Sequence, residues 1–172
     1  DDPSVVTGDR FVLVQDVLQA LQQLATHHRR TFDLPVIGIT GTNGKTTTKE
    51  LVHAVLSADR ATLATSGNLN NHIGVPLTLL RLNSEHRVAV IEMGANKPGD
   101  IAELCAIAEP THGLITNIGK AHLEGFGSYE GVIRTKTELY RYIHEHGGTL
   151  FVHADDALLM DRSKGIERIT YG

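Results

Sequence analysis

Apolar residues along the chain fall into short continuous runs, separated by stretches in which they recur every three to four residues. The short runs predict strands, and the three-to-four-residue spacing predicts amphipathic helices between them. The strands are expected at residues 36–40, 61–65, 88–93, 114–118, 150–153 and 168–171. Because strands alternate with helices, the pattern predicts an α/β fold with a mostly parallel sheet and helices on both faces.

The helices are expected at residues 16–30, after a turn at 41–44, from Pro76, at 100–109, and from Ser128 to the glycine pair at 147–148. Asp16 is expected near the start of the first helix, Ser128 can cap the last one, and Pro76 can open the helix that it begins. The helix after the turn is expected to carry on one face Leu51, Val52, Val55 and Leu56. Residues 1–10 are polar and predict irregular structure.

The composition narrows the class of protein. The 172 residues suit one domain, and a hydrophobic content of 41% is enough to bury a core. A net charge of −4 without a basic block argues against nucleic acid as the main partner. Cys105 is the only cysteine, which excludes an internal disulfide framework. No apolar run has the length of a membrane span and no signal peptide opens the chain, so we expect a cytoplasmic protein, acting as a monomer.

Residues 38–48 are the most informative stretch, because a glycine-bearing turn with a Lys-Thr pair joins an apolar run to a helix. Such a turn predicts a phosphate-binding loop and a P-loop NTPase-like fold. Lys45 would pair with the β- and γ-phosphates, and the Thr46 hydroxyl would bind Mg²⁺. The general glycine spacing would place a glycine where Ile39 stands, and an ordinary strand-to-helix turn is the alternative.

Polar groups follow other predicted strands as well, and the carboxyl ends of parallel strands meet at one edge of a sheet. Residues 66–76 form a loop dense in amides, and Glu92 closes an apolar strand. A carboxylate at that place suits Mg²⁺, with a solvated strand end as the alternative. Asn117 and His122 follow the next strand. His122 is a candidate metal ligand or phosphate contact, with a structural or solvated histidine as the alternative.

Lys136 is unusual because it falls on the apolar face of its predicted helix, four residues after Val132 and four before Tyr140. One interpretation is a snorkelling side chain, with a buried stem and a solvated amine. The other is a lysine held in a site, where desolvation lowers its pKa and leaves a reactive neutral amine. Reaction of that amine with CO₂ would give a carbamate able to bind Mg²⁺.

Four stretches together resemble a known family, namely residues 40–47, 67–76, 92–95 and 117–124. They are similar to the Mur ligases, the amide-forming enzymes of peptidoglycan precursor synthesis, whose own glycine spacing accounts for Ile39. Within that family they most resemble the branch that adds D-alanyl-D-alanine to UDP-N-acetylmuramoyl-tripeptide. The resemblance implies that ATP phosphorylates the tripeptide carboxylate, and that the dipeptide amine attacks the resulting acyl phosphate.

The resemblance also implies roles for individual residues. The nucleotide-binding set would be Gly41, Thr42, Asn43, Gly44, Lys45, Thr46, Thr47, Asn70 and Asn71. Thr46 and Glu92 would hold one Mg²⁺, and His122 with a carbamylated Lys136 would hold a second. The catalytic residues would be Lys45, His122 and Lys136.

The resemblance further implies that residues 1–172 are a single, incomplete central ATP-binding domain. The N-terminal domain that grips the UDP sugar and the C-terminal domain would be absent, so we expect no ligation by this chain alone. Two alternatives remain open. One is another Mur-type or folylpolyglutamate ligase, and the other is a non-catalytic nucleotide-binding module, which would need no lysine at position 136.

Overall fold

The computed structural model describes residues 12–119 and 123–172, and the predictions for residues 1–10 and for His122 lie outside them. Six parallel strands form one sheet in the order β2-β3-β1-β4-β5-β6. In chain order they are β1 (Val36–Thr40), β2 (Thr62–Ala64), β3 (Val88–Glu92), β4 (His112–Ile115), β5 (Thr149–His153) and β6 (Arg168–Tyr171). The predicted parallel α/β fold is therefore confirmed.

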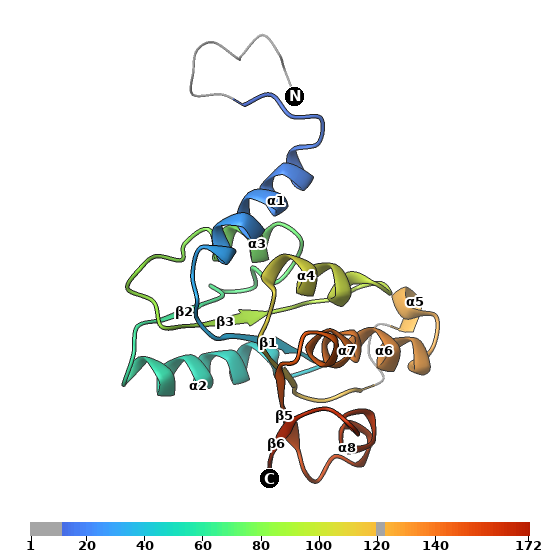
Figure 1. Cartoon of the computed structure of the whole chain (residues 1–172). Coiled ribbons are helices and arrows are strands. Elements are labelled where there is room, and N and C mark those ends of the chain that lie inside the picture. The colour runs from blue at the N-terminus through green and yellow to red at the C-terminus, as the bar shows by residue number, and fades with distance from the viewer. Residues whose placement is uncertain (1–11, 120–122) are drawn as a thin grey trace.

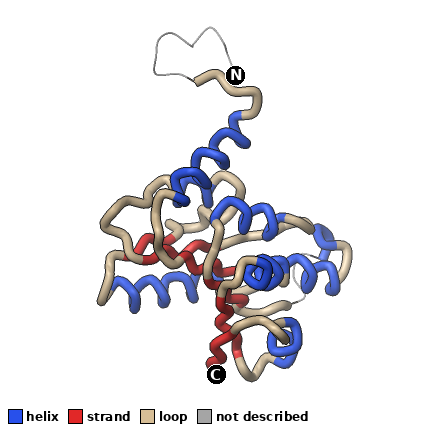
Figure 2. Tube along the Cα trace, in the orientation of Figure 1, coloured by secondary structure: helices blue, strands red, loops and turns tan. Residues whose placement is uncertain are grey.

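Helices cover both faces of this sheet, as predicted, but unequally (Figures 1 and 2). They are α1 (Val17–Arg30), α2 (Lys45–Ser57), α3 (Gly74–Leu79), α4 (Asp100–Ala108), α5 (Leu123–Phe126), α6 (Tyr129–Lys136), α7 (Glu138–Glu145) and α8 (Ala157–Arg162). Figure 1 shows α2 on the opposite side of the sheet from α3, α4 and α7. None of the helices in the described part of the chain combines the length and the apolar character needed to cross a membrane.

Alternate side chains of the central strands supply the two halves of the core. Val36, Ile91 and Leu150 face the larger cluster, which includes the buried residues of α4 and α7. Ile39 and Leu114 face the smaller cluster, against which Val52 and Leu56 of α2 pack. Because strands buried on both faces are apolar throughout, they appear in the sequence as continuous apolar runs.

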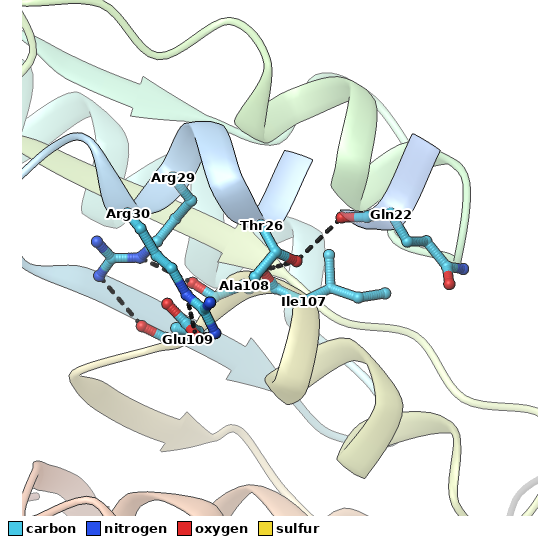
Figure 3. Close-up of polar contacts among 7 residues, drawn as sticks. All are labelled: Gln22, Thr26, Arg29, Arg30, Ile107, Ala108 and Glu109. Carbon is cyan, nitrogen blue, oxygen red and sulfur yellow. Dashed lines mark hydrogen bonds and ion pairs between the residues drawn. The ribbon is translucent and has the colours of Figure 1, made fainter. Parts of the chain in front are cut away.

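Hydrogen bonds and an ion pair connect helix α1 to the C-terminal end of α4 (Figure 3). The Arg29 guanidinium is buried and donates hydrogen bonds to the backbone carbonyls of Ala108, Phe32 and Glu109 at 3.0–3.2 Å. Burial lowers its pKa. Arg30 forms an exposed ion pair with the Glu109 carboxylate, and the Thr26 hydroxyl bonds the Ile107 carbonyl. These contacts fix α1 beside the α3–α4 side of the sheet.

Two predicted boundaries were wrong. Strand β4 ends at Ile115 rather than at residue 118. The Thr116 N–H still donates to the Thr40 carbonyl of β1, but Asn117 bonds Thr42 and Asn43 of the loop after β1 instead of continuing the ladder. The predicted single helix from Ser128 is two helices, since Thr137 ends α6 and begins α7. The Thr137 hydroxyl donates to the Ile133 carbonyl at 2.8 Å, which supports the break without a glycine or proline.

The predicted apolar face of α2 was half wrong. Leu51 and Val55 are 64% and 72% exposed, whereas Val52 and Leu56 pack on the sheet. The side that faces the sheet follows the spacing of Lys49, Val52 and Leu56, and this turns the other two outward. Lys49 is completely buried and forms an ion pair with Glu50.

Three further helix starts differ from the prediction. Helix α3 begins at Gly74, so that Pro76 lies within its first turn rather than at its start. The short helix α5 and the helix α8 were not predicted. Asp156 caps α8 by accepting hydrogen bonds from the N–H groups of Leu158 and Leu159, and this cap is a signal that the sequence does contain.

Candidate active site

The loop between β1 and α2 has the backbone of an anion-binding turn. Gly41 has φ +145° and Gly44 has φ +76°, conformations that favour glycine. A Cβ atom on Gly41 would lie 2.0 Å from Oγ1 of Thr116, so the close approach also requires glycine. Gly44 precedes α2 and provides no side-chain cap, which leaves N–H groups at the helix N-terminus for a ligand.

The loop is held in place by the residues that follow β4. The Thr42 N–H donates to the Asn117 carbonyl at 2.9 Å, and the Asn43 N–H donates to Asn117 Oδ1 at 3.1 Å. Asn117 Nδ2 donates in return to the Asn43 carbonyl at 2.9 Å, and the Thr116 hydroxyl donates to the same carbonyl at 2.7 Å. The loop is therefore preformed by contacts from a neighbouring strand end.

The Lys45 ammonium lies over this loop. Its Nζ donates to the carbonyls of Gly41 at 2.9 Å and Thr42 at 3.2 Å. Burial lowers the pKa of Lys45, and the charge of Glu92 opposes that shift. A cation beside glycine N–H groups can neutralise the oxygens of a bound polyphosphate.

Thr46 and Glu92 meet, as the sequence predicted. The Thr46 hydroxyl donates to Glu92 Oε1 at 3.2 Å, and Asn70 Nδ2 donates to the same oxygen at 2.8 Å. Glu92 is 1% exposed, and its Oε2 is buried without a hydrogen-bond partner among the described residues. An unpaired buried carboxylate oxygen is unfavourable without a cation. The residues present therefore fit a hard cation such as Mg²⁺, for which oxygen ligands are preferred.

Lys136 comes from the last turn of α6 and is only 4% exposed. Burial, reinforced by the nearby charge of Lys45, lowers its pKa to about 8, although the carboxylates of Asp100 and Glu138 act in the opposite direction. Its Nζ lies 5.8 Å from the centre of the Phe126 ring. The snorkelling interpretation is wrong for this residue, because its amine is buried in a pocket.

A cavity of about 180 Å³ lies between the phosphate loop, the loop that carries Asn70, and Lys136. Its wall includes Gly41, Thr42, Lys45, Asn70, Asn71 and Lys136 from the predicted set, together with His72, Asp100 and Phe126, which were not predicted. Thr47 is exposed in the first turn of α2, and the Asn71 side chain accepts hydrogen bonds from the N–H groups of Ile73 and Gly74.

The comparisons with known proteins agree with this geometry. The family model described as the Mur ligase middle domain matches residues 39–172. The chain belongs to the Mur ligase family. This Mur ligase chain is 42% identical, over 170 residues, to the UDP-N-acetylmuramoyl-tripeptide–D-alanyl-D-alanine ligase of Bacillus subtilis, covering 99% of this chain and 37% of that protein. It is 46% identical over 136 residues to the Escherichia coli enzyme of the same name, covering 79% of this chain and 30% of that protein.

Solved structures give the same result. The crystal structure of the MurF ligase from Thermotoga maritima in complex with ADP has a TM-score of 0.87 and 36% identity, covering 98% of this chain and 39% of that one. A MurF crystal structure from Acinetobacter baumannii has a TM-score of 0.85 and 42% identity, covering 94% and 36%. The Mur ligase chain described here thus spans less than two fifths of the length of these relatives.

Proposed function

We propose that the chain supplies the ATP site of a ligase that joins D-alanyl-D-alanine to UDP-N-acetylmuramoyl-tripeptide through an acyl phosphate. The observation that supports the proposal is that Lys45, Asn70 and Lys136 line one and the same cavity, next to the Thr46–Glu92 pair. The names of the relatives supply the substrates. We further propose that the protein acts in the cytoplasm as a monomer, and as the incomplete central domain of such an enzyme.

The nucleotide would bind with its phosphates on the loop. The N–H groups at the start of α2 and the Lys45 ammonium would contact the β- and γ-phosphate oxygens. Thr46 Oγ1 and Glu92 Oε2 would hold Mg²⁺, with Asn70 orienting the carboxylate. When bound, this ion would supply positive charge between the triphosphate and the carboxylate substrate.

Lys136 would act as a carbamate. A pKa of about 8 leaves about a quarter of the amine neutral near pH 7.5, and that amine can add CO₂ with loss of one proton. The product is an anion on the cavity wall. With His122, which lies outside the described residues, this anion would hold a second Mg²⁺. A nucleotide switch has no use for such a lysine, which is why we favour the ligase over a non-catalytic module.

The reaction would proceed in two transfers. A tripeptide carboxylate oxygen bonds to the γ-phosphorus as the bond from that phosphorus to the bridging oxygen breaks, and ADP leaves. The dipeptide amine then attacks the acyl carbon, and the tetrahedral intermediate collapses with loss of phosphate and of one amine proton. The Lys45 ammonium would stay close to the transferred phosphoryl group and neutralise its negative charge, because phosphoryl transfer depends mainly on positioning and charge neutralisation.

A chimera tests the proposal. Residues of the Bacillus subtilis relative that align with this chain, 37% of that protein, would be replaced by this sequence. We expect ATP-dependent amide formation, and a loss of at least about 100-fold in kcat when the chimera carries Lys45→Ala. A chimera that binds ATP but forms no amide would contradict the proposal, and its ATP binding would show that the failure is not one of folding.

A further inference from the structure

Three side chains of types that can ligate a metal lie close together, and two of them, His72 and Asp100, line the cavity described above. The three are His72 from the loop before α3, and Asp100 and Glu103 from the first turn of α4. One potential ligand atom from each lies within 4.8 Å of the other two. We propose that this triad binds a divalent cation of the Zn²⁺ or Mn²⁺ type, separate from the Thr46–Glu92 site, and that the cation ties the amide-rich loop to α4.

Asp100 supplies the first argument. It is 5% exposed, and its Oδ2 accepts hydrogen bonds from the N–H groups of Asn96 at 2.8 Å and Lys97 at 3.0 Å. Its Oδ1 is buried without a hydrogen-bond partner among the described residues. Two backbone donors therefore fix the orientation of a carboxylate whose second oxygen has no proton to accept. A cation would satisfy that oxygen.

His72 supplies the second argument. Its Nε2 lies 2.7 Å from Glu103 Oε2, yet the pair lacks hydrogen-bond geometry and Nε2 is buried without a hydrogen-bond partner in the described part of the chain. Metal–ligand bonds of about 2.1 Å place neighbouring ligand atoms about 3 Å apart. His72 Nε2 and Glu103 Oε2 are close together without a hydrogen bond between them, and this is the arrangement expected of two ligands of one ion.

The surroundings hold the triad in place and leave it accessible. Gln22 of α1 donates from Nε2 to the His72 carbonyl at 3.1 Å, which anchors the loop. The Glu103 side chain is 60% exposed, so an ion can enter from solvent. Lys136 lines the same cavity but donates no hydrogen bond to Asp100 among the described residues, and so leaves its Oδ1 unsatisfied.

The ligand set indicates the class of cation. Mg²⁺ prefers an all-oxygen shell with several waters, whereas one imidazole nitrogen with two carboxylate oxygens suits Zn²⁺ or Mn²⁺. Neutral His72 with ionised Asp100 and Glu103 carries a charge of −2, which matches a dication. A simple His72–Glu103 ion pair is the competing explanation, and it would leave Asp100 Oδ1 without a partner.

Calorimetric titration of the chelator-treated protein with Zn²⁺ tests the proposal. We expect His72→Gln and Glu103→Gln each to lose one equivalent of Zn²⁺, or to bind it at least tenfold more weakly. We also expect Zn²⁺ to raise the Tm of the wild-type protein more than that of either variant. Glu85→Gln, which removes an exposed carboxylate elsewhere, should bind as the wild type does.

Glu92→Gln separates this site from the proposed Mg²⁺ site. It should keep the Zn²⁺ equivalent that His72→Gln loses, because Glu92 is not part of the triad. If Glu103→Gln retains the full stoichiometry, affinity and Tm response of the wild type, the proposal is overturned. Since Glu103 is largely exposed, this variant gives a result even if a change at buried Asp100 prevents folding.

Discussion

Asn70 and Thr46 both donate to the same oxygen of Glu92, Oε1, at 2.8 and 3.2 Å. The other oxygen of that carboxylate, Oε2, is buried and has no hydrogen-bond partner among the described residues. The Asn70 carbonyl in turn accepts the Gly94 N–H at 2.7 Å, so Asn70 is fixed at both ends. The two hydrogen bonds to Oε1 therefore orient Glu92 so that one oxygen remains for a cation.

Removing the Asn70 amide should weaken the binding of Mg²⁺-dependent nucleotide. Asn70→Ala removes the shorter of the two hydrogen bonds that orient Glu92, and loss of a residue that orients a ligand typically costs about 10-fold in metal affinity. We expect the Kd for ADP to rise about tenfold in the presence of Mg²⁺, and to change little in its absence. Calorimetric titration with and without the ion measures both.

The neighbouring amide gives a matched control, because Asn71 has a different partner. Its Oδ1 accepts the N–H groups of Ile73 at 3.1 Å and Gly74 at 2.9 Å, at the start of α3. Asn71→Ala should lower the free energy of unfolding by about 1 kcal/mol, as loss of a cap does, while leaving the Mg²⁺ effect intact. If Asn71→Ala abolished the Mg²⁺ effect on ADP binding and Asn70→Ala only lowered stability, our division of roles would be wrong.

Substitution by alanine should destabilise the protein more at Gly41 than at Gly44. Gly41→Ala adds a methyl group 2.0 Å from Thr116 Oγ1 at a φ of +145°, so we expect a loss of about 2 kcal/mol or more and no nucleotide binding. Gly44→Ala meets no atom within 4 Å and is strained only by its φ of +76°, which costs about 1 kcal/mol. Urea unfolding compares the two. Equal losses would mean that contact with Thr116 does not constrain the loop.

The pH dependence of stability should reveal the buried amine of Lys136. Its pKa is lowered to about 8, so between about pH 8 and 10 the unfolded chain binds a proton that the folded chain does not. Stability attributable to Lys136 therefore rises with pH, and is lowest below pH 8, where both states are protonated. Relative to Lys136→Met, the wild type should gain up to about 2 kcal/mol between pH 7.5 and 9.5.

This measurement requires CO₂-free buffer, because a carbamate would replace the ammonium. Lys45, whose pKa is also lowered, is present in both proteins and so largely cancels in the comparison. A difference between the wild type and Lys136→Met that stays constant over this pH range would show that Lys136 titrates normally.

Substitution by lysine should lower the stability of the protein more at Arg29 than at Arg30. Arg29→Lys removes the planar donor group that reaches three carbonyls, and we expect a loss of about 2 kcal/mol. Arg30→Lys keeps a charge beside Glu109 at an exposed position, where ion pairs contribute less than about 1 kcal/mol. Urea unfolding of both variants measures these losses. A larger effect at Arg30 would contradict the assignment of the anchoring role to Arg29.

The sequence could predict those parts of the site that follow from strand ends. Lys45, Thr46 and Glu92 lie where a parallel sheet must bring them, at the carboxyl ends of β1 and β3. Helical periodicity placed Lys136 on the apolar face of its helix but left open whether its amine reaches solvent, and the structure shows the residue buried. The resemblance of four stretches indicated the family, and the family model and the relatives confirm it.

Long-range capping could not be predicted in this way. Glu138 fell inside the single helix predicted from Ser128 and was not singled out, yet it is 9% exposed and accepts the N–H groups of Gly99 and Ala102 at the start of α4. Asp100 likewise gave no signal as a cavity residue, because its role depends on how α4 packs against the loop that carries His72. No local pattern contains the partner of such a contact.

The phosphate loop has one consequence for the speed of ligand capture. With the Lys45 ammonium resting on the carbonyls of Gly41 and Thr42, and with Asn117 bracing the backbone, the entropy of ordering this segment is lost during folding and not at the encounter. An incoming polyphosphate has only to draw one flexible side chain away from two oxygens. We therefore expect its capture to be governed by diffusion and electrostatic attraction, without a slow rearrangement of the phosphate loop.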